Sequence, residues 1–427
     1  MKKLFFNFSV NEFFVFCYLS IFIIGELNTI DRLGPQTIAL NILNSLTLIW
    51  IFFSNPNFKY IFKYQGFLKL SSIFYFIIGI LISMVIYFKN SINYSESIIS
   101  ISHYFSVFLS LFCLSVLIYN SNIDRSRFLM YVILFLSIES IYVFYSIIDY
   151  YITYNNLGNW TRTFQIRGFT GNINITAFSI AYKIPFLLYK NSILSNKAFK
   201  YFNNFILTIS IINIFHLSSR GGILSLFITL IVFSIHYVFL KREIKTFFIQ
   251  YSYIIIGLLI SFFLLKNSSE LDIVNRTASI NINNKDGSID QRLRYYTEVL
   301  NYVWENPFKP IGVGIYKFKS IEFEKNNISQ YIVPYHTHND FLEILIENGI
   351  IAFLCYCLIF LSLAKELLYK IVVKNIYFYV PIFCFIIIYF FDSSLNFPIA
   401  RPISFLFFNY VVAFLISEKK IKWKKLF

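Results

Sequence analysis

Apolar runs of about 20 residues recur along most of this chain, and their length constrains the fold more than any other feature. An α-helix of that length crosses about 30 Å of hydrocarbon, and it satisfies its own backbone hydrogen bonds there. Hydrophobic residues make up 57% of the 427 positions and charged residues only 14%, whereas a typical soluble domain has about 45–50% and about 25%. The sequence therefore predicts an all-α, polytopic membrane protein.

Twelve apolar segments are predicted to span the membrane. They cover residues 10–25, 37–53, 70–88, 97–119, 128–151, 175–189, 202–217, 222–240, 249–265, 341–364, 375–391 and 402–417. This spacing predicts three parts: transmembrane helices one to nine in 1–265, a large outer loop in 266–340, and transmembrane helices ten to twelve with a basic tail in 341–427.

Basic residues are distributed unevenly between the connections, and their placement predicts the orientation. The chain has 37 Lys and Arg residues and a formal net charge of +15. If the amino terminus is cytoplasmic, 21 of the 37 basic residues lie in the cytoplasmic connections and the C-terminal tail. Six lie in the short loops on the other side of the membrane, namely Arg32, Lys89, Arg162, Arg167, Arg220 and Arg401. The positive-inside rule predicts that both termini are cytoplasmic. The basic excess is attributed to membrane anchoring, and no nucleic-acid binding is predicted.

The long segment between the ninth and tenth spans is predicted to contain a helix of its own. Ser288 and Gln291 have the spacing of a capping box, and a periodic stretch then runs to Glu305. Asn306-Pro307 is predicted to end it. Because long loops with internal structure are usually functional, this segment is a candidate part of the site.

Three arginines on the predicted outer side are candidates for binding phosphate. Arg220 is followed by Gly221-Gly222, a pair that predicts a tight turn at the membrane surface. A lone arginine there often extends to lipid headgroups, but its planar fork also suits phosphate oxygens. On the loop helix, Arg292 begins an apolar face, whereas Arg294 is predicted to pair with Glu298 four residues later.

Two histidines, His336 and His338, stand directly before the tenth span and allow two interpretations. Their spacing is compatible with a metal site, but the sequence has no HExxH motif and no cysteine partner nearby. Alternatively, Thr337 and Asp340 form the start of a helix and place His338 in its first turn. The positive end of the helix dipole would keep that imidazole neutral, so His338 is a candidate general base. No metal site is predicted.

Several motifs occur in a fixed order in the second half of the chain: Ser219-Arg220-Gly221-Gly222, then Arg292 with Trp304 and Pro310-Ile311-Gly312-Val313-Gly314, then His338-Asn339 with Gly349. Over about residues 160 to 365, this arrangement resembles the O-antigen ligase and polymerase superfamily. Asn172-Ile173-Asn174 is similar to that family's Asn-Pro-Asn element, with Ile173 in place of proline. Ala352 stands where the family has a second glycine.

The resemblance implies a membrane-embedded glycosyltransferase of helical, GT-C-like architecture. Its donor would be a glycan on undecaprenyl diphosphate, and transfer to a lipid or glycan acceptor would invert the anomeric carbon without a metal ion or cofactor. The matching positions assign Arg220 and Arg292 to the diphosphate and His338 to base catalysis. The further candidates for substrate binding are Arg167, Asn174, Asn339, Arg294 and His336.

The acceptor and the wider class remain open at the sequence level. A ligase would use lipid A-core or a similar acceptor, and a polymerase would join lipid-linked repeat units. A polysaccharide or lipid-linked oligosaccharide transporter would need ionisable residues along a path inside the membrane, and the spans offer Glu139, Asp149, Lys183 and His236. The outer-side candidates favour the enzyme. Together with this placement, the resemblance implies a bacterial inner-membrane protein with its active site facing the periplasm.

Overall fold

The computed structural model describes residues 9–25, 33–54, 68–121, 123–154, 168–241, 243–266, 287–325 and 334–418. Within these ranges the regular structure is entirely helical. The main helices are α1 (Val10–Ser20), α2 (Leu33–Ser54), α4 (Leu68–Tyr87), α5 (Tyr94–Ser121), α6 (Arg125–Tyr154), α7 (Ile173–Ile193), α8 (Lys197–His216), α9 (Arg220–Ser234), α10 (Ile244–Lys266), α12 (Gly287–Glu305), α13 (Tyr316–Phe323), α14 (Asp340–Leu368), α15 (Tyr379–Leu395) and α16 (Pro402–Ser417).

Every one of the twelve predicted apolar segments lies on one of these helices. Among the described residues, eight helices are long and apolar enough to cross a membrane: α2, α4, α5, α6, α8, α9, α10 and α14. Short π-helical turns, Ile235–Lys241 and Tyr369–Val373, extend α9 and α14. Three shorter apolar helices are α1, α15 and α16. The all-α membrane architecture is confirmed, and the count of twelve spans stays a prediction.

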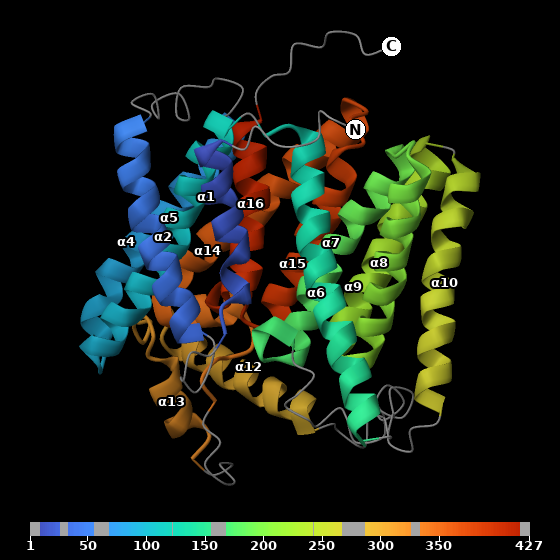
Figure 1. The fold of residues 1–427 in the computed structure, drawn as a ribbon. Helices are drawn as coiled ribbons and strands as arrows, with labels where there is room; N and C mark the ends of the chain where they lie inside the picture. The colour runs from blue at the N-terminus through green and yellow to red at the C-terminus, as the bar shows by residue number, and fades with distance from the viewer. Residues whose placement is uncertain are drawn as a thin grey trace.

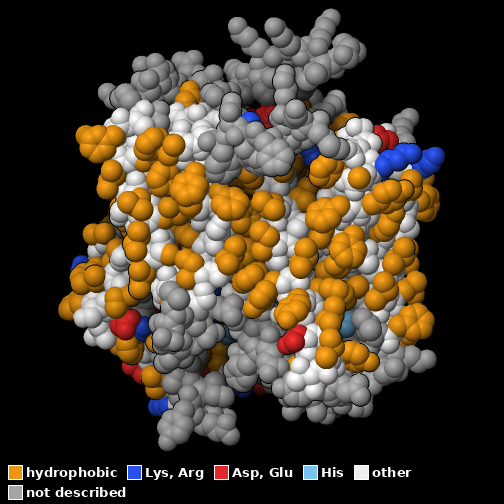
Figure 2. Space-filling model, viewed as in Figure 1, with side chains coloured by type: hydrophobic (Ala, Val, Ile, Leu, Met, Phe, Trp, Pro, Cys, Tyr) orange, Lys and Arg blue, Asp and Glu red, His pale blue; other side chains and the backbone are white. Residues whose placement is uncertain are grey.

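The sides of the bundle carry the apolar surface that a membrane protein presents to lipid. Large hydrophobic side chains are exposed along α2 and α10, for example Phe52, Phe53 and Phe262. Figure 2 shows hydrophobic side chains as a broad band across the face in view, with most of the visible charged groups near the two ends of the molecule. By contrast, α7 packs against α6, α8, α9 and α15, and its residues from Ile175 to Tyr189 are buried. A helix that is buried on all sides forms the centre of such a bundle.

The two ends of the bundle differ in structure. At one end, Arg127 contacts Glu12 at 2.5 Å and Arg125 contacts Glu418 at 2.7 Å, so the starts of α1 and α6 meet the end of α16. The opposite end carries α12, which lies crosswise to the bundle, and α13 beside it (Figure 1). We call this opposite end the α12 end, and it contains the candidate site.

The helix predicted in the long loop is present as α12, which ends at Glu305 as expected. Its buried Val299 packs with Ile311, Ile315 and Ile346 in a small core separate from the main one. Backbone hydrogen bonds from Ile311 N to Ile346 O and from Gly312 N to Glu347 O fix the chain after α12 against the first turns of α14. The loop segment is therefore attached to the membrane helices through α14.

Candidate functional site

The turn before α14 determines where both histidines lie. Asn339, rather than Thr337, is the N-cap of α14, and its side chain accepts the backbone N–H of Leu342 at 3.1 Å. His338 consequently lies before the helix, with a φ of +58°. The prediction that His338 occupies the first helical turn was wrong. Asn is as good an N-cap as Ser and better than Thr, and Thr337 instead accepts the N–H of Asn339 at 3.1 Å.

His338 is neutral at physiological pH for a different reason from the one predicted. Burial lowers its pKa to about 4, and the positive charges of Arg292 and Arg401 act in the same direction. Its ring packs edge-on against Phe397, with 5.1 Å between the ring centres. Its Nδ1 is buried and has no hydrogen-bond partner in the part of the chain that the structure describes. The helix dipole is not needed to explain this neutral state.

Arg292 approaches His338 from α12, along the predicted apolar face. Tyr296, one turn further along that face, donates its hydroxyl to the backbone oxygen of His338 at 3.0 Å. Val299 and Val303 continue the face into the small core. The charge of Arg292 acts on both His338 and Asp392, which come from different segments. The structure therefore brings Arg292 and His338 together.

Arg294 points to another part of the loop structure, and its predicted partner was wrong. Its guanidinium donates to both carboxylate oxygens of Glu324, at 3.2 and 3.3 Å, and to Asp290 at 3.2 Å. Glu324 follows α13 directly, so local helix spacing could not reveal this pair. Glu298 lies beside Glu324 instead, and burial together with that neighbouring carboxylate raises its pKa to about 7. Arg294 thus joins α12 to α13.

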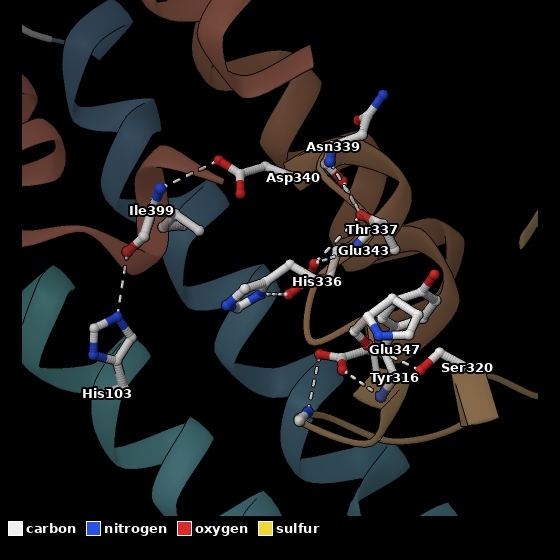
Figure 3. Close-up of polar contacts among 12 residues, drawn as sticks. His103, Tyr316, Ser320, His336, Thr337, Asn339, Asp340, Glu343, Glu347 and Ile399 are labelled. Atoms are coloured by element: carbon white, nitrogen blue, oxygen red, sulfur yellow. Dashed lines mark hydrogen bonds and ion pairs between the residues drawn. The ribbon is translucent and has the colours of Figure 1, made fainter. Parts of the chain in front are cut away.

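His336 contacts a carboxylate at the turn before α14. Its Nδ1 lies 2.9 Å from Oε1 of Glu343 on α14, and its ring stacks on Phe397 with 4.3 Å between the centres and 17° between the planes. The other oxygen of Glu343 accepts the backbone N–H of Thr337 at 3.0 Å. Figure 3 shows His336 pointing at Glu343, with Thr337 behind that carboxylate.

A glycine-rich loop and a second glutamate support this turn. Glu347 accepts the backbone N–H groups of Gly314 and Tyr316, both at 2.9 Å (Figure 3). Gly312 and Gly314 have φ values of +98° and +72°, and a Cβ on either would meet Ser91 or Ser100 at less than 3 Å. Only glycine adopts such a backbone without strain. This geometry explains why the motif needs its two glycines.

Residues after α15 complete the surroundings of the histidines. Ile399 donates its N–H to Asp340 at 3.3 Å, and its oxygen faces Nε2 of His103 at 3.3 Å (Figure 3). The guanidinium carbon of Arg401 lies 4.8 Å from the centre of the Phe397 ring. Phe397 therefore contacts His336, His338 and Arg401 at once.

Arg220 lies at the same end of the bundle, at the start of α9. Ser219 is the N-cap, and the preceding turn is made by Ser218 with a φ of +48°. The prediction that the glycine pair makes this turn was wrong, because Gly221 and Gly222 are helical. A Cβ on Gly222 would meet the Cβ of Ala177 at 2.7 Å, so this glycine allows α9 to approach α7. α15 packs against both α9, which begins at Arg220, and α14, which follows His338.

The remaining candidates are distributed more widely. Asn172 is the N-cap of α7, and Ile173 therefore occupies the first helical position, where proline is favoured. Asn174 lies in that first turn, at the α12 end. Asn339 takes part in the site as the cap of α14. Arg162 and Arg167 lie outside the described residues.

Sequence reasoning missed the contribution of Phe397 and Arg401. Both follow α15, about sixty residues after the histidines in the sequence, and no motif connects the two segments. The one available signal was Arg401 itself, an arginine on the less basic side of the membrane. The pairing of Glu343 with His336 was not predicted either.

The four ionisable residues that the sequence places inside the spans have separate surroundings, apart from one ion pair. Lys183 contacts Glu139 at 2.8 Å, and both are buried. His236 lies among the rings of Phe233, Tyr237 and Tyr377 at the opposite end from α12, and Asp149 is exposed. The described residues contain no group of three or more His, Cys, Asp or Glu side chains arranged to hold a metal ion.

The fold and the site define a multi-pass helical membrane protein that gathers arginine and histidine side chains at one end of its bundle. Residues 205–357 match the family model of the O-antigen ligase. The match includes Arg220, Arg292, His336 and His338, and it confirms the resemblance that the motifs indicate. No curated protein matches the chain significantly.

Proposed function

We propose that the chain is a membrane glycosyltransferase of the O-antigen ligase type. It would transfer a glycan from undecaprenyl diphosphate to an acceptor such as lipid A-core. The observation that carries this proposal is that the charge of Arg292 acts on His338 at one end of the bundle, with both residues inside the matched domain.

The arginines supply the charge that the leaving group needs. Cleavage of the bond between the anomeric carbon and the diphosphate leaves negative charge on phosphate oxygens. Guanidinium groups stabilise such charge through bidentate hydrogen bonds. We assign this role to Arg292 and Arg220, as the family motifs imply, with Arg401 as a further cation beside the site.

We infer that the α12 end faces the periplasm and that both termini are cytoplasmic. The excess of basic residues in alternate connections supports this orientation. A donor exposed on the periplasmic leaflet would then reach the site without crossing the bundle. A transporter is not proposed, because Lys183 and Glu139 neutralise each other within the interior.

Deletion of the gene in its host tests the proposal. Surface glycan is then separated on gels and compared with that of the parent strain. A ligase predicts loss of all attached glycan, whereas a polymerase predicts attachment of single repeat units. Unchanged glycan would contradict both. A strain complemented with an Arg292→Ala variant provides the matched control, because its protein keeps the same membrane helices.

A further inference from the structure

Trp304, which belongs to the same motif as Arg292, lies on the outer surface of α12. Its side chain is 87% exposed. Leu293 and Leu300 are exposed on the same helix, and Phe308, shortly after the helix ends, is 76% exposed. Single exposed hydrophobic residues are common and need no explanation, but a group of them marks a surface that contacts a partner or a membrane.

Leu293, Leu300 and Trp304 lie on one flank of α12. Each residue of an α-helix turns by about 100°, so positions seven and eleven residues after Leu293 return to within about 20° of its direction. Asn301 and Glu305, both exposed, lie about 100° further round and form a polar stripe. We call Leu293, Leu300 and Trp304 the apolar flank. It lies between the polar stripe and the face of α12 that packs in the small core.

Hydrogen bonds attach the segment after α12 to the turn between α4 and α5. The side-chain amide of Asn90, in the 3-10 turn Phe88–Asn90, donates to the backbone oxygen of Pro310 at 2.8 Å. The hydroxyl of Ser97 on α5 donates to the backbone oxygen of Val313 at 2.7 Å. In Figure 1, α4 stands at the edge of the bundle. Phe308, two residues before Pro310, is therefore close to the outer end of a membrane helix.

Exposed apolar side chains of α4 continue to this same turn. Val85 and Ile86 are exposed in the last turn of α4, and Ile92 and Tyr94 are exposed just beyond it. The helix itself is long and apolar enough to cross a membrane, so its exposed apolar side faces lipid. Phe308 lies beside the end of this lipid-facing surface and extends it towards the apolar flank of α12.

Lysines accompany the aromatic side chains at this place. Lys89 lies in the turn after α4, Lys309 directly follows Phe308, and both are exposed. A lysine at a membrane surface extends its ammonium group to the lipid phosphates while its stem stays among apolar groups. Tryptophan and tyrosine are enriched at the same level. An apolar flank beside a polar stripe, with aromatic residues and lysines, is typical of a helix that lies in the membrane interface.

We propose that the apolar flank and Phe308 insert into the headgroup layer of the surrounding membrane, so that α12 is an interfacial helix with lipid as its partner. Arg292 lies on the same helix, and this anchoring holds it at the level of the lipid phosphates. The inference goes beyond the proposed function. It rests on the membrane architecture and holds whatever reaction the site carries out, so its failure and that of the proposed function are distinguishable.

Tryptophan fluorescence of the purified full-length protein tests this inference in nanodiscs of phosphatidylethanolamine and phosphatidylglycerol. The chain has four tryptophans, so the emission of Trp304 is obtained as the difference between the wild type and Trp304→Phe. Two quenchers are compared: lipid brominated near the headgroup, which acts within the membrane, and iodide, which acts from water. The matched control is Trp304→Phe combined with Glu305→Trp, which moves the indole from the apolar flank to the neighbouring polar stripe.

We expect brominated lipid to quench the emission of Trp304 at least about three-fold more strongly than that of the control, and iodide to quench it at least about three-fold less, because the flank is covered by headgroups. Quenching by brominated lipid no stronger than in the control would overturn the inference. An exposed tryptophan can also stack on a sugar. Iodide quenching that stops only when the oligosaccharide of the proposed acceptor is added would assign Trp304 to glycan and would likewise overturn the inference.

Discussion

Replacing Arg294 by Ala is expected to loosen the contact between α12 and α13 by about 2 kcal/mol. Arg294 makes two hydrogen bonds to Glu324, at 3.2 and 3.3 Å. Hydrogen bonds to charged groups each contribute about 1.5–3 kcal/mol, whereas exposed ion pairs contribute about 0–1 kcal/mol. The arginine side chain is 38% exposed and Glu324 only 4%. The two hydrogen bonds together are therefore expected to contribute about as much free energy as one buried hydrogen bond to a charged group, about 2 kcal/mol. That energy corresponds to about a 30-fold change in the opening equilibrium.

Hydrogen exchange of the α13 amides, measured on the purified protein in lipid nanodiscs, tests this value. Arg294→Ala should accelerate exchange about 30-fold, and Arg294→Lys should have a smaller effect because lysine keeps the charge but lacks the fork. Lys319→Ala is the control, since its partner Glu322 is 60% exposed. Unchanged protection in Arg294→Ala would show that the bidentate contact does not hold α13.

Three further results are expected. Burial and Glu324 raise the pKa of Glu298 to about 7, above its unfolded value of about 4.3. Protonated Glu298 therefore stabilises the folded state. This stabilisation is complete below about pH 4.3 and is lost as the pH rises through about 7. Exchange of α13 should accelerate over that range, and Glu298→Gln should remove the dependence. Gly222→Ala should cost about 1–3 kcal/mol through its contact with Ala177 and should lower the Tm, whereas Gly25→Ala, with open space around it, should not. Glycan transfer by the purified protein should persist in EDTA, and its abolition would indicate a metal.

The membrane architecture could be predicted because composition and segment length determine it. Apolar runs of helical length leave few alternatives in lipid, and all twelve segments lie on helices. The apolar face of α12 was also predictable, because residues at helical spacing share a side. Arg292 and Val299 lie on that face as the periodicity requires.

The wrong predictions concern positions where several residues in the sequence suit the same role and the local sequence does not distinguish them. Thr337 and Asn339 both suit an N-cap, and their contacts in the folded protein selected Asn339. Arg294 was predicted to pair with Glu298, but it contacts Asp290 on the other side along the helix and the buried Glu324 from another segment.

Sequence patterns could not predict contacts between segments that lie far apart in the chain. Phe397 lies against His336 and His338 only because the segment after α15 folds back towards α14. Its sequence position gives no spacing that would identify it. The candidate residues could therefore be predicted to share one side of the molecule, but the contacts between them could not be predicted.

The central claim is tested most directly by glycan transfer with the wild-type protein and with Arg292→Lys, in nanodiscs that contain an undecaprenyl diphosphate-linked donor. We expect transfer by the wild type and a loss of at least a hundred-fold in Arg292→Lys, because lysine lacks the bidentate fork that stabilises a departing diphosphate. Equal transfer by both proteins, or no transfer by the wild type with any acceptor, would contradict the proposed function.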